Sequence, residues 1–176
     1  MRPILALAAA FAFAGSASAA LAPGAKAPDF TTRGAIAGKV TTVNLAALLK
    51  RGPVVLYFFP AAFTPGCNAE AQAFAQNVDA FRKAGATVVG MSADPVDALV
   101  KFSAKECAGK FAVASAGPAV VKGYDVALGR QVQGRDVTNR TSYVIGRDGK
   151  IAYVHSDLDA AQHVKLTLDA VKRLKV

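Results

Sequence analysis

The chain has 176 residues, 53% of them hydrophobic, and a formal net charge of +9 at pH 7. This length fits one domain with a core of its own and excludes an array of several large domains. Its lysines and arginines are scattered along the chain, whereas a nucleic-acid-binding protein is expected to show a basic stripe or an aromatic-basic motif, so we expect no nucleic-acid partner.

Residues 1–20 have the pattern of a cleaved secretory signal peptide. Arg2 precedes an apolar run from Ile4 to Ala14, and small residues follow, with Ala17-Ser18-Ala19 as the cleavage site. The run is too short to span a bilayer, and no later segment approaches that length, so we expect no membrane insertion. The sequence therefore predicts an exported, periplasmic-type protein whose mature domain covers residues 21–176.

The first strongly patterned segments after the signal predict a strand, a helix and a second strand. Val54 to Phe59 is a continuous apolar run, typical of a strand buried on both faces. A helix is expected over about 68–83 and is ended by Gly85. It is indicated by apolar residues at helical spacing, namely Phe74, Val78 and Phe81. The apolar residues 87–91 predict the second strand.

A second helix is expected to follow, with Asp94 as N-cap and Pro95 in the first helical position. This helix fades near 107–109, and the segments 111–113 and 119–124 predict a short strand and a short helix. The apolar positions of the second helix are Val96, Leu99 and Phe102.

The chain ends with a predicted hairpin and helix. The strands 142–145 and 151–155 are joined across Asp148-Gly149, a tight-turn pair, and an amphipathic helix runs over 159–174. Its inward positions are Val164, Leu168 and Val171. A βαβ start followed by an antiparallel hairpin and a helix predicts an α/β fold: a thioredoxin-like mixed β-sheet with helices on both faces.

Two cysteines, Cys67 and Cys107, remain after removal of the signal. In an exported protein they can pair, either as a permanent structural disulfide or as a redox couple, and their number alone does not separate the two.

The position of Cys67 favours a reactive thiol. It follows a predicted buried strand and lies at the start of a helix, where unpaired N–H groups and the helix dipole stabilise a thiolate. Pro60 stops the strand, Pro65 and Gly66 shape the turn without crowding the sulfur, and the Thr64 hydroxyl can point at whatever approaches it. Such an arrangement suits a nucleophile for a small polar substrate.

The motif Pro60-x-x-x-Thr64-x-x-Cys67 resembles the active-site signature of the peroxiredoxins, and Thr64-Pro65-Gly66-Cys67-x-x-Glu70 is similar to their bacterioferritin comigratory protein or Q-type branch. The resemblance covers nearly all of the mature chain. Its further segments are Pro23-Gly24-x-x-Ala27-Pro28-Asp29-Phe30, Ser92-x-Asp94, Arg140 to Ile145, and Asp148-Gly149-Lys150-Ile151.

The resemblance implies a thiol peroxidase that reduces hydrogen peroxide and organic hydroperoxides. Cys67 would be the peroxidatic nucleophile and would become a sulfenic acid. Thr64 would hydrogen-bond the peroxide, Arg140 would favour the thiolate and polarise the peroxide, and Pro60 would shield the sulfur from water. Backbone N–H groups at the helix start would hold the developing charge. No metal or organic cofactor is implied, and the branch is usually monomeric.

The same resemblance predicts how Cys67 is resolved. Q-type members often carry the resolving cysteine five residues later, but that position is Gln72, and Cys107 lies near the place that other members use. The implied cycle is a Cys67–Cys107 disulfide reduced by an external dithiol such as thioredoxin. Because the two helices are expected to hold the thiols too far apart to bond, local unfolding would be part of turnover.

Two alternatives stay open on the residues alone. A thioredoxin-like thiol-disulfide oxidoreductase would need Cys-x-x-Cys, and position 70 is Glu70. A non-enzymatic module with a structural disulfide would be inert to peroxide. Glu70 is read mainly as a helix-stabilising acid of the first turn. His155 and His163 have no ligand-like spacing, so a metal site is not expected.

Overall fold

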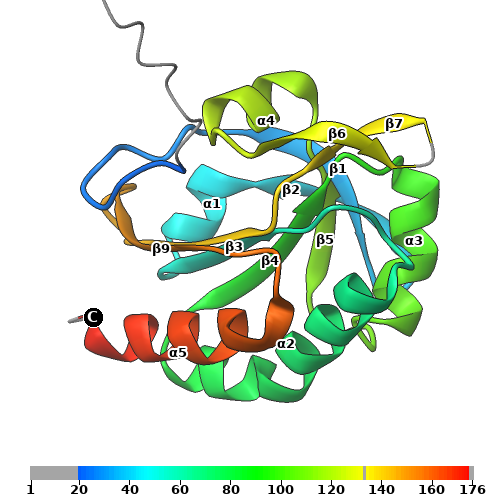
Figure 1. Ribbon diagram of the computed structural model, residues 1–176. Helices are drawn as coiled ribbons and strands as arrows, with labels where there is room; N and C mark the ends of the chain where they lie inside the picture. The colour runs from blue at the N-terminus through cyan, green and yellow to red at the C-terminus, as the bar shows by residue number, and fades with distance from the viewer. Residues whose placement is uncertain (1–19, 133, 175–176) are drawn as a thin grey trace, which may run out of the picture.

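The computed structural model describes residues 20–132 and 134–174, and the predicted signal peptide lies almost wholly outside these residues. A seven-stranded mixed sheet forms the centre, in the order β2-β1-β5-β4-β3-β8-β9 (Figure 1). Its strands are β1 (Thr31–Ile36), β2 (Lys39–Asn44), β3 (Val54–Phe58), β4 (Thr87–Ser92), β5 (Ala112–Ser115), β8 (Thr141–Ile145) and β9 (Ile151–Ser156). A separate two-stranded ribbon consists of β6 (Ala127–Val132) and β7 (Arg135–Thr138).

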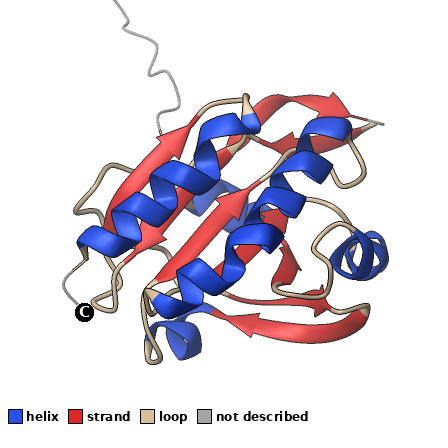
Figure 2. Cartoon of the chain, turned by 90° about the horizontal axis from the view of Figure 1, so that it is seen from below, coloured by secondary structure: helices blue, strands red, loops and turns tan. Residues whose placement is uncertain are grey.

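Helices cover both faces of the sheet, as predicted. They are α1 (Leu45–Leu49), α2 (Pro65–Lys83), α3 (Val96–Lys105), α4 (Pro118–Gly123), a 3-10 turn η1 (Ala160–Gln162) and α5 (His163–Arg173). Helices α2 and α5 lie side by side across one face, as both views show (Figures 1 and 2). Helices α1 and α4 pack on the opposite face. The thioredoxin-like mixed α/β architecture is therefore confirmed.

Strand β3 divides the interior into two cores. Its side chains alternate, so that Val55 and Tyr57 pack under α2, α3 and α5, while Val54, Leu56 and Phe58 pack under α1 and α4. All five strand residues are fully buried. The prediction of a strand buried on both faces is confirmed, and it explains why the run shows no polar alternation.

The register of β3 decides which residues meet at its carboxyl end. It pairs in parallel with β4 and antiparallel with β8, and the latter pairing places Phe58 opposite Thr141. Arg140 directly precedes Thr141, so the antiparallel pairing brings Arg140 to the end of the sheet where the chain leaves β3 and reaches Pro60. The sheet thereby brings Pro60 and Arg140, which are 80 positions apart in the sequence, to the same end of the strands.

Several boundaries differ from the predicted ones. Helix α2 begins at Pro65 rather than near 68, because Thr64 takes the N-cap position with extended backbone. The expected N-cap Asp94 is wrong: Pro95 is the N-cap of α3, and the Asp94 carboxylate instead accepts hydrogen bonds from Ala62 N–H and Ser92 Oγ. The last helix starts as the 3-10 turn η1 before α5.

Candidate active site

Cys67 lies in the first turn of α2 and is 1% exposed. The N–H groups of Gly66 and Cys67 precede the first intrahelical bond, which Asn68 N–H donates to the Thr64 carbonyl at 2.9 Å. The sulfur therefore sits at the end of the helix where backbone donors are unpaired and the dipole is positive, which stabilises negative charge.

Arg140 joins the cysteine to two other parts of the chain. Its Nη2 donates to Cys67 Sγ at 3.6 Å, its Nε donates to the Leu158 carbonyl at 2.8 Å, and its Nη1 pairs with Glu70 Oε2. The arginine is only 5% exposed. A Cβ at Gly66 would lie 3.3 Å from Arg140 Nη2, so glycine leaves the guanidinium room beside the sulfur.

The loop between β3 and α2 is held at its start and in its middle by hydrogen bonds to other elements. The Phe59 carbonyl accepts from Thr138 Oγ1 at 2.7 Å, and Ala62 N–H donates to Asp94 Oδ2 at 2.7 Å. Asp94 is buried, and its other oxygen accepts from Arg135 Nη2 at 3.2 Å. It therefore ties the Cys67 loop to β4 and β7, a role hidden in the sequence because Asp94-Pro95 reads as a helix start.

Two more of the predicted site residues, Pro60 and Thr64, lie in this loop and are half-buried. Thr64 Oγ1 donates to the Ala61 carbonyl at 3.0 Å, which leaves its oxygen lone pairs free to accept. Phe63 is 43% exposed, with a φ of 64°, and its ring packs edge-on against Phe102. The rim of the site is thus apolar on this side.

Glu70 and His163 form a buried polar pair behind Arg140. Both side chains are 0% exposed, and Glu70 Oε1 lies 3.7 Å from His163 Nδ1. Burial raises the pKa of Glu70 to about 7 against the opposing effect of Arg140, and burial lowers the pKa of His163 to about 4. The sequence interpretation of Glu70 as a first-turn acid is wrong, because α2 begins at Pro65 and its first turn contains no acidic residue. Spacing along the chain does not show that α5 brings His163 against Glu70.

The two histidines also meet each other, although their spacing did not predict it. The rings of His155 and His163 lie 4.5 Å apart in an edge-on contact. Within residues 20–132 and 134–174, no cluster of three or more histidine, cysteine or acidic residues is arranged to hold a metal ion.

Cys107 follows the end of α3 and belongs to the same core cluster as Cys67. Both thiols are free and buried, and burial raises the pKa of Cys107 well above its ordinary range, with a further contribution from Glu106. Two contacts tie this segment to α2: Gln72 Nε2 donates to Glu106 Oε2 at 2.7 Å, and Lys110 Nζ donates to the Ala75 carbonyl at 3.1 Å.

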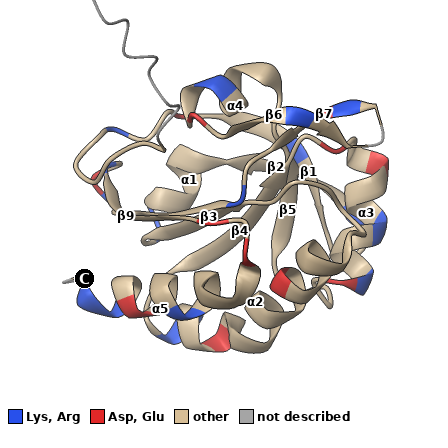
Figure 3. Cartoon of the chain, in the orientation of Figure 1, with Lys and Arg blue, Asp and Glu red and all other residues tan. Residues whose placement is uncertain are grey.

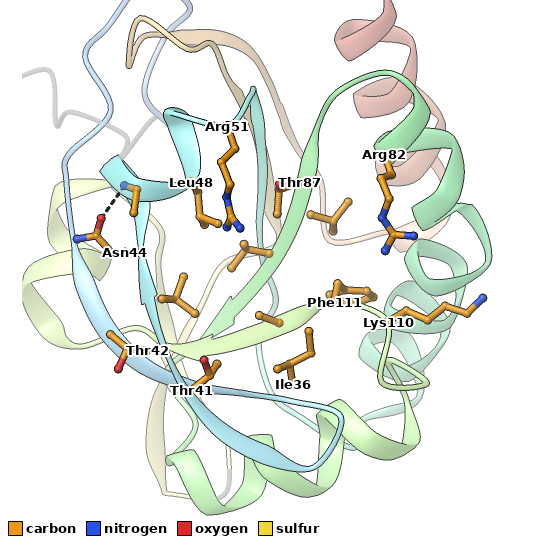
Figure 4. A pocket seen from close by; sticks show the side chains of 15 residues that line it. Ile36, Thr41, Thr42, Asn44, Leu48, Arg51, Arg82, Thr87, Lys110 and Phe111 are labelled. Carbon is orange, nitrogen blue, oxygen red and sulfur yellow. Dashed lines mark hydrogen bonds between the residues drawn. The ribbon is translucent and has the colours of Figure 1, made fainter.

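A different hollow lies at the opposite end of the parallel strands. Its volume is about 380 Å³, and Arg51 and Arg82 point their guanidinium groups into it from two sides (Figure 4). Its lining includes Thr87, the first residue of β4, but no cysteine, histidine or carboxylate. Basic residues elsewhere are spread over α4, β6, β7 and α5 (Figure 3). Cys67 and Arg140 meet outside this hollow, at the carboxyl end of β3.

Comparison with known proteins agrees with this geometry. The profile of the AhpC/TSA family matches residues 23–154. Peroxiredoxin Bcp of Escherichia coli K12 is 32% identical over 121 residues, covering 68% of this chain and 78% of the relative. The crystal structure of peroxidoxin BcpB from Mycobacterium tuberculosis superimposes with a TM-score of 0.77 at 30% identity, covering 88% of this chain and 98% of the other.

A further solved structure, peroxiredoxin Q of Xanthomonas campestris, has a TM-score of 0.68 at 28% identity and covers 80% of this chain and 89% of its own. The family match, the sequence relatives and the fold agree with the motif around Cys67. The chain belongs to the AhpC/TSA family, and within it to the peroxiredoxins of the Bcp and Q type.

Proposed function

We propose that this peroxiredoxin reduces hydroperoxides through a Cys67 thiolate. The sulfur attacks the terminal peroxide oxygen, an S–O bond forms, the O–O bond breaks, and the alcohol or water leaves after taking up a proton. The observation that carries the proposal is Arg140 Nη2 at 3.6 Å from Cys67 Sγ, at the unpaired N–H end of α2. Thr64 Oγ1 accepts from the incoming peroxide, and Pro60 keeps water from the sulfur.

Organic hydroperoxides are substrates as well as hydrogen peroxide. Two large apolar side chains near the site are exposed, Phe63 at 43% and Leu158 at 48%, and Leu158 also supplies the carbonyl that holds Arg140. An alkyl group can rest on such a rim while the peroxide reaches Cys67. The similar bacterioferritin comigratory protein of Xanthomonas campestris has an alkyl peroxide reduction activity.

Cys107 resolves the sulfenic acid of Cys67 by forming a disulfide, which an external dithiol of the thioredoxin type reduces. Both thiols are free and buried in the same core cluster. A buried Cys107 is not available as an attacking thiolate, so the segment around it opens before the disulfide forms. A Cys-x-x-Cys oxidoreductase is disfavoured because Glu70 occupies the second cysteine position under Arg140.

The protein acts outside the cytoplasm as a monomer. The export proposal rests on the signal-type pattern of residues 1–20, and the monomer proposal rests on the resemblance to the Q-type branch. No helix in the described ranges combines the length and apolarity needed to cross a membrane.

One experiment separates these roles. Wild type, Cys67→Ser and Cys107→Ser are each treated with one equivalent of hydrogen peroxide, and the products are identified by mass spectrometry with a sulfenic-acid trap. We expect a disulfide in wild type, a trapped sulfenic acid in Cys107→Ser, and no peroxide consumption in Cys67→Ser. Peroxide consumption that survives Cys67→Ser contradicts the proposed function. A stable sulfenic acid in wild type contradicts only the role of Cys107.

A further inference from the structure

One oxygen of Glu70 meets no hydrogen-bond donor in the described structure, although the side chain is fully buried. Oε2 pairs with Arg140 Nη1, whereas Oε1 has no hydrogen-bond partner and faces His163 Nδ1 at 3.7 Å. An ionised oxygen buried without a donor keeps its full desolvation penalty, which is larger for a charged group than for a neutral one. The protonation of this pair therefore needs an explanation.

The contacts of His163 fix which ring nitrogen carries hydrogen. Nε2 lies 2.9 Å from the Asp157 carbonyl oxygen, which can only accept, so Nε2 is the N–H. Nδ1 lies 2.8 Å from Ser142 Oγ, whose hydroxyl donates to it. Since burial lowers the pKa of His163 to about 4, the ring is neutral at neutral pH. Nδ1 therefore presents a lone pair, not an N–H, to Glu70.

The charges around Glu70 also favour a proton on its carboxyl group. Arg140 is the cation that contacts both Glu70 and Cys67. With a Cys67 thiolate and a Glu70 carboxylate together, one cation would face two buried anions, which is unfavourable in a medium that screens poorly. A proton on Glu70 removes one anion and gives Oε1 a hydrogen of its own.

Three other titratable groups surround the pair of Glu70 and His163. Tyr57 of β3 lies within electrostatic reach, and burial raises its pKa well above the ordinary value, so it stays neutral. The ring of His155, from β9, lies edge-on against the ring of His163. Asp159, beside η1, lines the same surface cavity as Glu70 and adds negative charge there.

We propose that Glu70 holds a proton while Cys67 is a thiolate and releases it when Cys67 becomes a sulfenic acid. This inference rests on the proposed peroxidase function. Oxidation converts Cys67–S⁻, Glu70–COOH and ROOH into Cys67–SOH, Glu70–COO⁻ and ROH. The S–O bond replaces the O–O bond, and the release from Glu70 matches the proton that the leaving oxygen takes up. Arg140 thus neutralises one anion before the reaction and one after it.

A surface cavity lies beside Glu70. It measures about 490 Å³ and lies between the start of α2 and η1. Glu70 is among its lining residues, and most of the others are small, including Gly66, Ala69, Ala73, Ala160 and Ala161. The Glu70 carboxyl group is thus buried behind small side chains at the wall of this cavity.

The chain offers a direct test because it contains only two glutamates, Glu70 and Glu106. Protein carrying glutamate labelled with ¹³C at the side-chain carboxyl gives one NMR resonance for each, assigned with Glu106→Gln. The carboxyl of Glu70 is titrated in reduced Cys107→Ser, in Cys107→Ser oxidised to the sulfenic acid, and in Cys67→Ser. Glu106 serves as the internal control.

In the reduced protein we expect Glu70 to be protonated at about pH 6, since burial places its pKa near 7. In the oxidised protein and in Cys67→Ser its midpoint should fall by about one unit or more, because the competing anion is gone. A carboxylate at this pH in the reduced protein, or one midpoint common to all three forms, overturns the proposal. If mass spectrometry shows that peroxide forms no sulfenic acid, the proposed function is overturned instead. The comparison of reduced Cys107→Ser with Cys67→Ser then still tests whether the Cys67 thiolate keeps Glu70 protonated.

Discussion

Replacing Gln72 by alanine should loosen the segment that buries Cys107. Gln72 Nε2 donates to Glu106 Oε2 at 2.7 Å, and the Glu106 side chain is only 4% exposed. A hydrogen bond to a charged group contributes about 1.5–3 kcal/mol. Because Gln72 itself is exposed, water can replace part of the bond in the variant, so the lower value of about 1.5 kcal/mol applies. The open population should therefore rise about tenfold.

The assay is the rate at which a thiol reagent labels Cys107 under native conditions, in a Cys67→Ser background where a single thiol remains. Labelling requires opening, since Cys107 is 0% exposed, and its rate follows the opening equilibrium. The matched control is Gln76→Ala, one turn later on α2. Gln72 and Gln76 line one cavity of about 280 Å³, but Gln76 makes no side-chain hydrogen bond in the described structure. Equal acceleration by both substitutions, or by neither, would refute the reasoning.

Two further predictions concern stability. Gly90→Ala should lower the free energy of unfolding by about 1–3 kcal/mol, because an added Cβ there would lie 2.8 Å from the Tyr57 ring. The control Gly117→Ala should lower it less, because no atom lies within 4 Å of an added Cβ and only the N-cap of α4 is changed. Urea unfolding compares the two, and equal losses would contradict the steric argument. In a Glu70→Gln background, which removes the opposing carboxyl titration, stability should fall by about 3 kcal/mol as the pH drops from 6.5 to about 4. The pKa of His163 is lowered on folding, so the unfolded chain binds the proton first; adding His163→Gln should flatten this dependence, and a persistent slope would assign it to other groups.

The sequence predicts the centre of the fold well because its signals there are local. The run Val54–Phe59 is apolar on both faces, and the helix after it repeats apolar residues at helical spacing, so both were identified. The β1–β2 hairpin, α1 and the β6–β7 ribbon were missed. Their strands are mostly exposed and mix polar with apolar residues, so neither strict alternation nor a continuous apolar run marks them.

The same distinction between local and long-range signals applies to the candidate site. The position of Cys67 at a helix start follows from adjacent residues, and the resemblance supplied Arg140. The contacts of Asp94 with Ala62, and of His163 with Glu70, join elements distant in sequence. No periodicity or spacing encodes such contacts, because sheet register and helix packing create them.

The register of β3 against β8 places Arg140 beside the buried thiol of Cys67. Because Phe58 lies opposite Thr141, the sheet that forms the core also delivers Arg140 to the sulfur, and no flexible segment has to find it. The same packing leaves Cys107 buried under contacts from α2. In the proposed cycle, the site is therefore preorganised for the first step, attack on the peroxide, while the second step, disulfide formation, requires part of the core to open. Gln72 occupies the position where Q-type relatives often carry the resolving cysteine, and we expect it to be one of the residues that set the population of this open state.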